Sequence, residues 1–178
     1  MVQGVHGAAW VGVLRWLALA LSCVAAASAS EPTEPAWFAN VEAELRAALA
    51  PTAAVIEHTE RQLTVRCPVR LVFAADRAEL LPAGTAMLDA LARSLRDYKR
   101  TQVVVAVYTD TIGTAEFNQQ QSQGRAGVVA AYLQIHGVAP ERLVARGVGE
   151  AAQLPAPDTP EGRDLNRRLE LIITPLSS

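Results

Sequence analysis

One spaced set of polar residues offers the clearest chemistry in this sequence. Asp110 follows the apolar run 103–107, which predicts a buried strand. The carboxylate is therefore expected beyond the carboxyl end of a strand, where the loops of α/β sheets commonly hold ligands. Asn118, Ser122 and Arg125 follow at i, i+4 and i+7, so on a helix they form one polar stripe.

This arrangement suits a zwitterionic ligand. Asp110 can accept hydrogen bonds from an ammonium group, and Arg125 can hold a carboxylate through two parallel hydrogen bonds. Each residue also has a plainer use, since such an Asp often accepts from backbone donors in a loop and such an Arg is often solvated. For either residue taken alone, the plainer use is the more common one.

Periodicity and end signals predict the helices that position this set. Prolines and glycines supply most of the boundaries, because proline suits the first turn of a helix and glycine the position after its end. The predicted helices are residues 37–49, a helix that begins at Pro82 with an apolar face of Met87, Leu88, Leu91, Leu95 and Tyr98, a helix from its cap Thr114 to His136, and a turn at Thr159-Pro160.

Short apolar and alternating runs predict the strands. They comprise a hairpin of 53–58 and 63–67, whose second arm continues through 69–73, the central strand 103–107, a core strand that begins at 143–145 and is interrupted by Gly147 and Gly149, and a last strand in which Leu169, Leu171 and Ile173 share one face. The order predicts an α+β fold with one mixed β-α-β-α-β-β sheet and helices packed on one face, preceded by a helix and a hairpin.

The chain is expected to begin with an export signal over residues 1–29. Arg15 precedes a twelve-residue apolar stretch, 16–27, and small residues lead up to a cleavage site after Ala29. The alternative is lipoprotein processing with lipid on Cys23, although the residues before this cysteine match that signal poorly. The rest is expected to divide into a tether with a short helix, 30–52, and one domain, 53–178.

Composition narrows the classes of function. The formal charge of −2, or −3 without a leader that carries Arg15, does not favour nucleic-acid binding, and there is no lysine-rich tail for an anionic membrane. The two cysteines and three histidines are scattered, so no metal site is predicted. Cys67 has no histidine at a recognisable spacing and is expected to be a buried apolar residue rather than a nucleophile.

Several ordered motifs resemble the OmpA-like domain, which also occurs in Pal lipoproteins and in the flagellar stator protein MotB. The similarity runs from about Val55 to Leu176, and its motifs are Phe73 to Leu80, Thr109-Asp110 to Arg125-Ala126, Gly137-Val138 with Arg142-Leu143, Gly147 to Glu150, and Glu161-Gly162-Arg163 with Asn166-Arg167-Arg168. Each motif alone is weak, whereas their order and spacing together are a strong signal.

The resemblance implies a non-catalytic periplasmic or outer-membrane-associated protein that binds peptidoglycan, without a cofactor, by clasping the meso-diaminopimelate of the stem peptide. Asp110 and Arg125 match the pair that grips this side chain. Asp76, Asn118 and an arginine of the Asn-Arg-Arg segment, Arg167 or Arg168, match positions that complete the pocket. Other envelope proteins and the outer membrane remain open as further partners.

Two other functions are weighed against this one. The chain has Val107-Tyr108 where the family usually has Gly-His, and this change could leave an OmpA-like fold that serves as a protein-interaction module without wall binding. A wall hydrolase would need Asp110 with Glu116 or Glu150 as an acid/base pair. No further residue supports such an enzyme.

Overall fold

The computed structural model describes residues 34–176 except for residues 51, 53 and 60. The predicted export signal and the alternative lipidation site at Cys23 lie outside the described residues. Among the described helices, none has the length and apolar character needed to cross a membrane.

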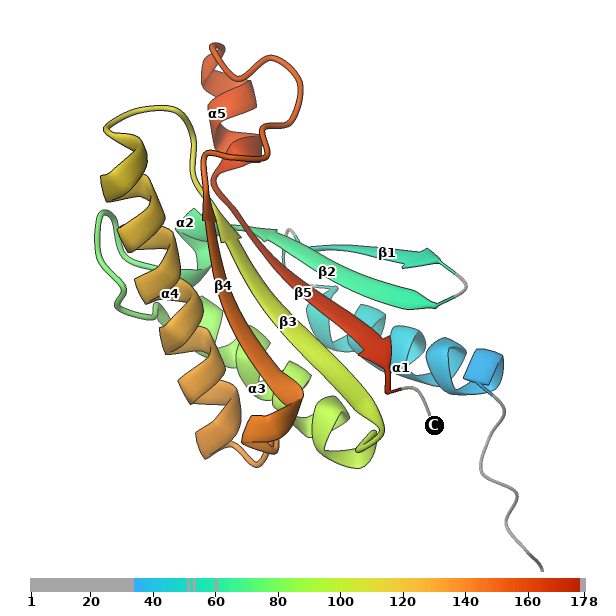
Figure 1. Ribbon diagram of the computed structural model, residues 1–178. Coiled ribbons are helices and arrows are strands. Elements are labelled where there is room, and N and C mark those ends of the chain that lie inside the picture. The colour runs from blue at the N-terminus through green and yellow to red at the C-terminus, as the bar shows by residue number, and fades with distance from the viewer. Residues whose placement is uncertain (1–33, 51, 53, 60, 177–178) are drawn as a thin grey trace, which may run out of the picture. The chain divides into compact units, whose positions relative to one another are not determined.

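A five-stranded mixed sheet forms the centre of the fold (Figure 1). Its strands, in spatial order, are β1 (Val55–Thr59), β2 (Gln62–Pro68), β5 (Arg168–Pro175), β3 (Thr101–Tyr108) and β4 (Leu143–Gly149). Neighbouring strands are antiparallel except for β3 and β4, which are parallel and are joined by a helical crossover. The last strand in the sequence therefore lies in the middle of the sheet.

The helices confirm most of the predicted boundaries. They are α1 (Glu34–Leu49), the single turn α2 (Val69–Val72), α3 (Pro82–Asp97), α4 (Ala115–Ile135), the 3₁₀ turn η1 (Pro140–Arg142) and α5 (Pro160–Asn166). The hydroxyls of Thr114 and Thr159 each accept a backbone N–H at the start of α4 and α5, as N-caps do. Gly137, just beyond α4, has a φ of 96°, a conformation that favours glycine.

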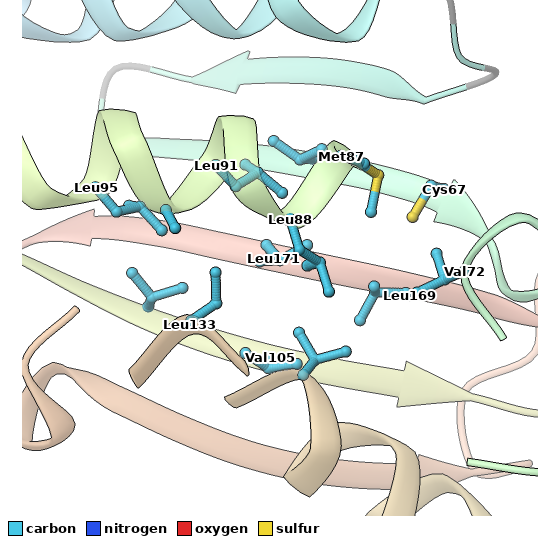
Figure 2. Close-up of a cluster of buried hydrophobic side chains, with 14 of the residues drawn as sticks. Cys67, Val72, Met87, Leu88, Leu91, Leu95, Val105, Leu133, Leu169 and Leu171 are labelled. Carbon is cyan, nitrogen blue, oxygen red and sulfur yellow. The ribbon is translucent and has the colours of Figure 1, made fainter. Parts of the chain in front are cut away.

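One apolar core lies between the sheet and the helices. Alternate residues of the central strands point into it, and Leu169, Leu171 and Ile173 are fully buried there as predicted. Figure 2 shows Leu88, Leu91 and the other apolar side chains of α3 packed over β2 and β5. Val41, Leu45 and Leu49 of α1 belong to the same cluster. The mixed α+β fold is as predicted.

Two predicted strands were wrong in detail. Residues 69–73 do not continue β2, because the chain turns after Pro68 into α2 and buries Val69 and Val72 in the core. The β-branched composition suggested a strand, and tertiary packing overrode it. The strand predicted to be interrupted by Gly147 and Gly149 continues through Gly147 and ends at Gly149, although its register against β3 shifts after Gly147, and it lies at the edge of the sheet rather than in its core.

The topology brings three distant segments together at one end of the sheet. Because β5 is antiparallel to β3, the start of β5 lies beside the end of β3, with Leu169 opposite Val107. The loop that follows β3 thus lies near the end of α5, which extends beyond this end of the sheet (Figure 1). Pro68, at the end of β2, is paired with Arg168 and brings the loop after α2 to the same region.

Candidate functional site

A cleft of about 740 Å³ opens at this end of the sheet. It lies between the loop that follows α2, the loop after β3, the first turns of α4 and the end of α5. Its lining residues are Val69, Arg70, Phe73, Ala74, Ala75, Asp76, Leu81, Thr109, Asp110, Ile112, Gly113, Phe117, Asn118, Gln121, Arg125 and Arg167. Five of the six residues predicted to bind the ligand therefore share one cavity.

Arg125 is the buried cation of the cleft. Its residue is only 6% exposed, and its Nε donates to the carbonyl of Arg77 at 3.1 Å, while Nη1 donates to Gln121 Oε1 at 3.3 Å. The guanidinium also lies 5.5 Å from the centre of the Phe73 ring. No carboxylate of the described residues forms an ion pair with it. Burial lowers its pKa, against a smaller opposing effect of nearby Asp76.

Asp110 is the buried anion of the cleft, with a side chain that is 8% exposed. Its Oδ1 accepts the backbone N–H of Ile112 at 3.1 Å, which closes the turn after β3. Its Oδ2 accepts Arg167 Nη1 at 2.5 Å. The carboxylate thus has both a structural role in the loop and a cationic partner.

Asn118 and Ser122 hold the surroundings of the cleft in place. Asn118 Nδ2 donates to the carbonyl of Asp110 at 3.3 Å and to Glu150 Oε2 at 2.6 Å. Ser122 Oγ accepts the N–H of Gly149 in β4 at 3.0 Å. The polar stripe predicted on α4 is therefore present, but the side chains of its first two members, Asn118 and Ser122, are already hydrogen-bonded within the protein. Arg125 is the charged member of this stripe, and it forms no ion pair with a carboxylate of the described residues.

Asp76 lies in the exposed loop between α2 and α3. Its φ of 54° is uncommon for a residue other than glycine, although Asp tolerates it better than most. The loop is closed by the N–H of Ala74, which donates to the carbonyl of Glu79 at 2.9 Å. Because Arg125 donates to the carbonyl of Arg77 in the same loop, one side chain links this wall of the cleft to α4.

The structure separates the two arginines of the Asn-Arg-Arg segment. Arg167 lies in the cleft and contacts both Asp110 and Asp164, and these hydrogen bonds raise its pKa despite the opposing effect of burial. Arg168 belongs to β5, so its side chain points to the opposite face of the sheet. There its Nε donates to Glu170 Oε1 at 2.8 Å.

Val107 and Tyr108, which stand where the family usually has Gly-His, do not line the cleft. Val107 is fully buried in the apolar core. The ring of Tyr108 lies on the opposite face of the sheet, 3.6 Å from the guanidinium carbon of Arg168. Burial and the nearby carboxylate of Glu170 raise the pKa of Tyr108. Neither Val107 nor Tyr108 therefore forms a wall of this cavity.

Several residues of the cleft were not among those predicted from the sequence. Phe73 and Gln121 surround Arg125, and Gln121 could have been found because it precedes Arg125 by one helical turn. Ile112 and Phe117 form an apolar rim and are 62% and 56% exposed. No local signal marks Phe73 as a neighbour of Arg125, because the two residues come from different elements.

The cleft therefore presents the buried guanidinium of Arg125, which forms no ion pair with a carboxylate of the described residues, and the carboxylate of Asp110, which is paired with Arg167. Such a cavity can bind a group with separated positive and negative charges through charge-assisted hydrogen bonds. Among the described residues there is no cluster of three or more His, Cys, Asp or Glu side chains that could hold a metal ion.

Comparisons with known protein families and sequences agree with one another. The sequence model of the OmpA family matches residues 72–167. The chain is 34% identical over 135 residues to the probable lipoprotein YiaD of Escherichia coli K12, a match that covers 76% of this chain and 62% of YiaD. It is 35% identical over 103 residues to the peptidoglycan-binding protein ArfA of Mycobacterium tuberculosis, with 58% of this chain and 32% of ArfA covered. The chain thus spans less than two thirds of these relatives.

Among solved structures, a MotB-like protein from Desulfovibrio vulgaris has the same fold. The two align with a TM-score of 0.70 at 24% sequence identity, over 82% of this chain and 94% of that protein. The alignment extends beyond the stretch matched by the family model, and it supports the topology described above.

Proposed function

Because this chain belongs to the OmpA family, we propose that it binds peptidoglycan by clasping the meso-diaminopimelate of the stem peptide, without catalysis. The chain is a protein of the cell envelope, in the periplasm or at the outer membrane, as its relatives are.

The observation that carries this proposal is the state of Arg125. A guanidinium that is largely removed from water and forms no ion pair with a carboxylate of the described residues is costly, because its lost hydration is only partly compensated by its hydrogen bonds to Arg77 and Gln121. The end of a diaminopimelate side chain supplies the missing carboxylate, and its ammonium group is a partner for Asp110. The name of ArfA, which describes a relative as binding peptidoglycan, supports the same class of ligand.

In this proposal, other predicted residues of the cleft position the two charged side chains or form its walls. Asn118 positions the Asp110 loop through its two hydrogen bonds. The loop around Asp76 forms the wall next to Arg125, and Arg167 is the cleft-lining arginine of its segment. Arg168, on the opposite face of the sheet, is not included in the clasp.

Co-sedimentation with isolated sacculi that contain meso-diaminopimelate tests the proposal. Hydrogen bonds to charged groups contribute about 1.5–3 kcal/mol, so Asp110→Asn and Arg125→Gln are each expected to weaken binding by roughly one to two decades. Arg93→Gln and Asp97→Asn remove the same charges from exposed positions of α3 outside the cleft, and they are expected to bind like the wild type.

The same experiment separates the alternative functions. Wild-type protein that stays in the supernatant would reject wall binding and favour a protein-interaction module. Release of soluble fragments from the sacculi would reject the non-catalytic proposal, and loss of that release in Glu150→Gln or Glu116→Gln would then identify the acid or base. Equal binding by the two cleft variants and the two controls would show that the clasp lies elsewhere.

A further inference from the structure

One arginine of the cleft has no part in the clasp proposed above. Arg70 lines the cavity, and its side chain forms neither an ion pair nor a hydrogen bond with the described residues. Of the two other arginines in the lining, Arg167 contacts Asp110 and Asp164. In the proposed clasp, Arg125 binds the carboxylate of diaminopimelate. The zwitterionic end of that side chain has a single carboxylate, so a ligand held by the clasp alone leaves Arg70 without an anionic partner.

The short turn α2 places Arg70 in the cleft. Two valines of α2 are buried in the core, whereas Arg70 between them is exposed. The backbone N–H of Val69 donates to the carbonyl of Arg167 at 2.9 Å, which joins the start of α2 to the end of α5. Arg125 is joined instead to the loop after α2, because its Nε donates to the carbonyl of Arg77 at 3.1 Å. The two arginines without an ion pair are therefore held by different parts of the cleft wall.

The cleft is also larger than the end of one side chain requires. Its volume of about 740 Å³ falls in the range of about 300–1,000 Å³ that is typical of pockets which enclose most of a small-molecule ligand. Neighbouring parts of the stem peptide can therefore enter together with diaminopimelate. These parts have carboxylates of their own, one on D-glutamate and one at a C-terminal D-alanine, and a guanidinium can bind a carboxylate through two parallel hydrogen bonds.

We propose that Arg70 binds a second carboxylate of the stem peptide, so that the cleft holds the wall peptide at two anionic groups rather than one. This inference rests on the proposed function, and it adds a contact outside the diaminopimelate side chain. Because Arg70 is exposed, its replacement should not disturb the core, and effects on binding can be measured in a folded protein.

Isothermal titration calorimetry with three tetrapeptides tests the proposal. All three contain meso-diaminopimelate. The first has free carboxylates on D-glutamate and D-alanine, the second has the D-glutamate carboxylate amidated, and the third has the C-terminal carboxylate amidated. The wild type is expected to bind at least one of the two amides about tenfold more weakly than the acid, the scale of one charge-assisted contact.

Variants of Arg70 assign that difference to its side chain. Arg70→Gln is expected to bind the acid about tenfold more weakly than the wild type does, and to bind the acid and one amide equally. The amide that is no longer distinguished identifies the carboxylate that Arg70 binds. Arg70→Glu should reverse the preference, because a carboxylate at this position repels the acid but not the amide.

Arg93→Gln is the matched control. It removes the same charge from an exposed position of α3 outside the cleft, and it should bind all three peptides like the wild type. Circular dichroism of each variant confirms that it is folded.

Results that contradict this inference differ from those that contradict the proposed function. If the wild type binds the acid and both amides equally, no second carboxylate is bound. If Arg70→Gln keeps the wild-type preference for the acid, whether or not it weakens all three peptides alike, Arg70 does not contact that carboxylate. In both cases the diaminopimelate clasp stands. If the wild type binds none of the three peptides, the proposed function fails and this inference fails with it.

Discussion

At the scale of single residues, Arg125 and Arg142 show how the same side chain can serve a site or a scaffold. Both are at least nine-tenths buried, and burial lowers the pKa of both guanidinium groups. Arg142, however, donates to the carbonyls of Leu95, Tyr98 and Thr101 at 2.8–2.9 Å and also to the Thr101 hydroxyl. It therefore joins the end of α3 to the start of β3, whereas Arg125 lines the cleft and forms no ion pair with a carboxylate of the part of the chain that is described.

Replacing Arg142 should consequently affect stability rather than binding. Arg142→Met leaves two buried carbonyls and a partly buried one without their charged donor, so the free energy of unfolding is expected to fall by about 3 kcal/mol or more. Urea denaturation measures the loss. Arg146→Met, at an exposed position of β4, is the matched control and should stay within about 0.5 kcal/mol of the wild type. Equal stability of the two variants would contradict the structural role of Arg142.

At the scale of elements, α4 does two tasks at once. Its inner side reaches the cleft through Arg125, and an adjacent row of polar side chains contacts the backbone of the edge strand β4. Gln119 Nε2 donates to the carbonyl of Gly147 at 2.9 Å, and Gln123 Oε1 accepts its N–H at 2.7 Å. An edge strand with satisfied backbone groups is protected from pairing with other chains. The helix that carries the candidate anion site therefore also closes this edge of the sheet.

This contact requires a glycine in β4. A Cβ at Gly147 would lie 2.3 Å from the backbone nitrogen of Gln123, so Gly147→Ala must push α4 away from β4. We expect a loss of about 2–3 kcal/mol in the free energy of unfolding. We also expect weaker sacculus binding, because the same shift displaces Arg125.

The matched control for Gly147→Ala is a glycine of α4, the helix that packs against Gly147. Gly124 has no atom within 4 Å of an added Cβ, so its small size serves no packing there, and Gly124→Ala should stabilise the protein by up to about 1 kcal/mol through helix propensity. Thermal or urea denaturation of Gly147→Ala and Gly124→Ala measures both changes in stability. A tolerated Gly147→Ala would show that the close approach of α4 and β4 is not required.

At the scale of the whole molecule, the sheet separates the apolar core from a face on which several charged side chains meet. The face under the helices holds the core, including Cys67, which is 1% exposed. The other face carries a chain of charges in which Glu170 Oε1 accepts from both Arg66 Nε at 2.9 Å and Arg168 Nε at 2.8 Å. Burial works against the ionised form of Glu170, but these hydrogen bonds outweigh it and hold its pKa below the ordinary value.

The buried thiol should make global stability fall at alkaline pH. Burial raises the pKa of Cys67 from 9.0 to about 12. Because the folded pKa lies above the unfolded one, this contribution is fully present below about pH 9 and is lost as pH rises toward 12. At about pH 11 the loss should approach 3 kcal/mol.

Urea denaturation of the wild type and of Cys67→Ala between about pH 8 and about pH 11 checks this prediction, because the ionisation of tyrosines is common to both proteins and cancels in the difference. The stability advantage of the wild type should shrink as pH rises. A constant difference, or rapid alkylation of the folded thiol at about pH 8, would contradict the buried state of Cys67.

The sequence alone predicted the order of the elements and most of their boundaries. It also singled out Asp110 and Arg125, which both line the cleft. These features are local: apolar periodicity distinguishes strands from helices, caps and prolines mark their ends, and spacing on one helix places Asn118, Ser122 and Arg125 on one side. The family resemblance could be read from the same short motifs, because they recur in order along the chain.

Only the tertiary structure decided what depends on contacts between distant segments. Arg167 and Arg168 are neighbours in sequence, yet one caps α5 and enters the cleft while the other begins β5 and points to the opposite face. The pairing of Asp110 with Arg167 spans 57 residues and depends on β5 lying beside β3, which no local pattern encodes. The same reason explains α2, where packing against the core outweighed the strand propensity of its residues.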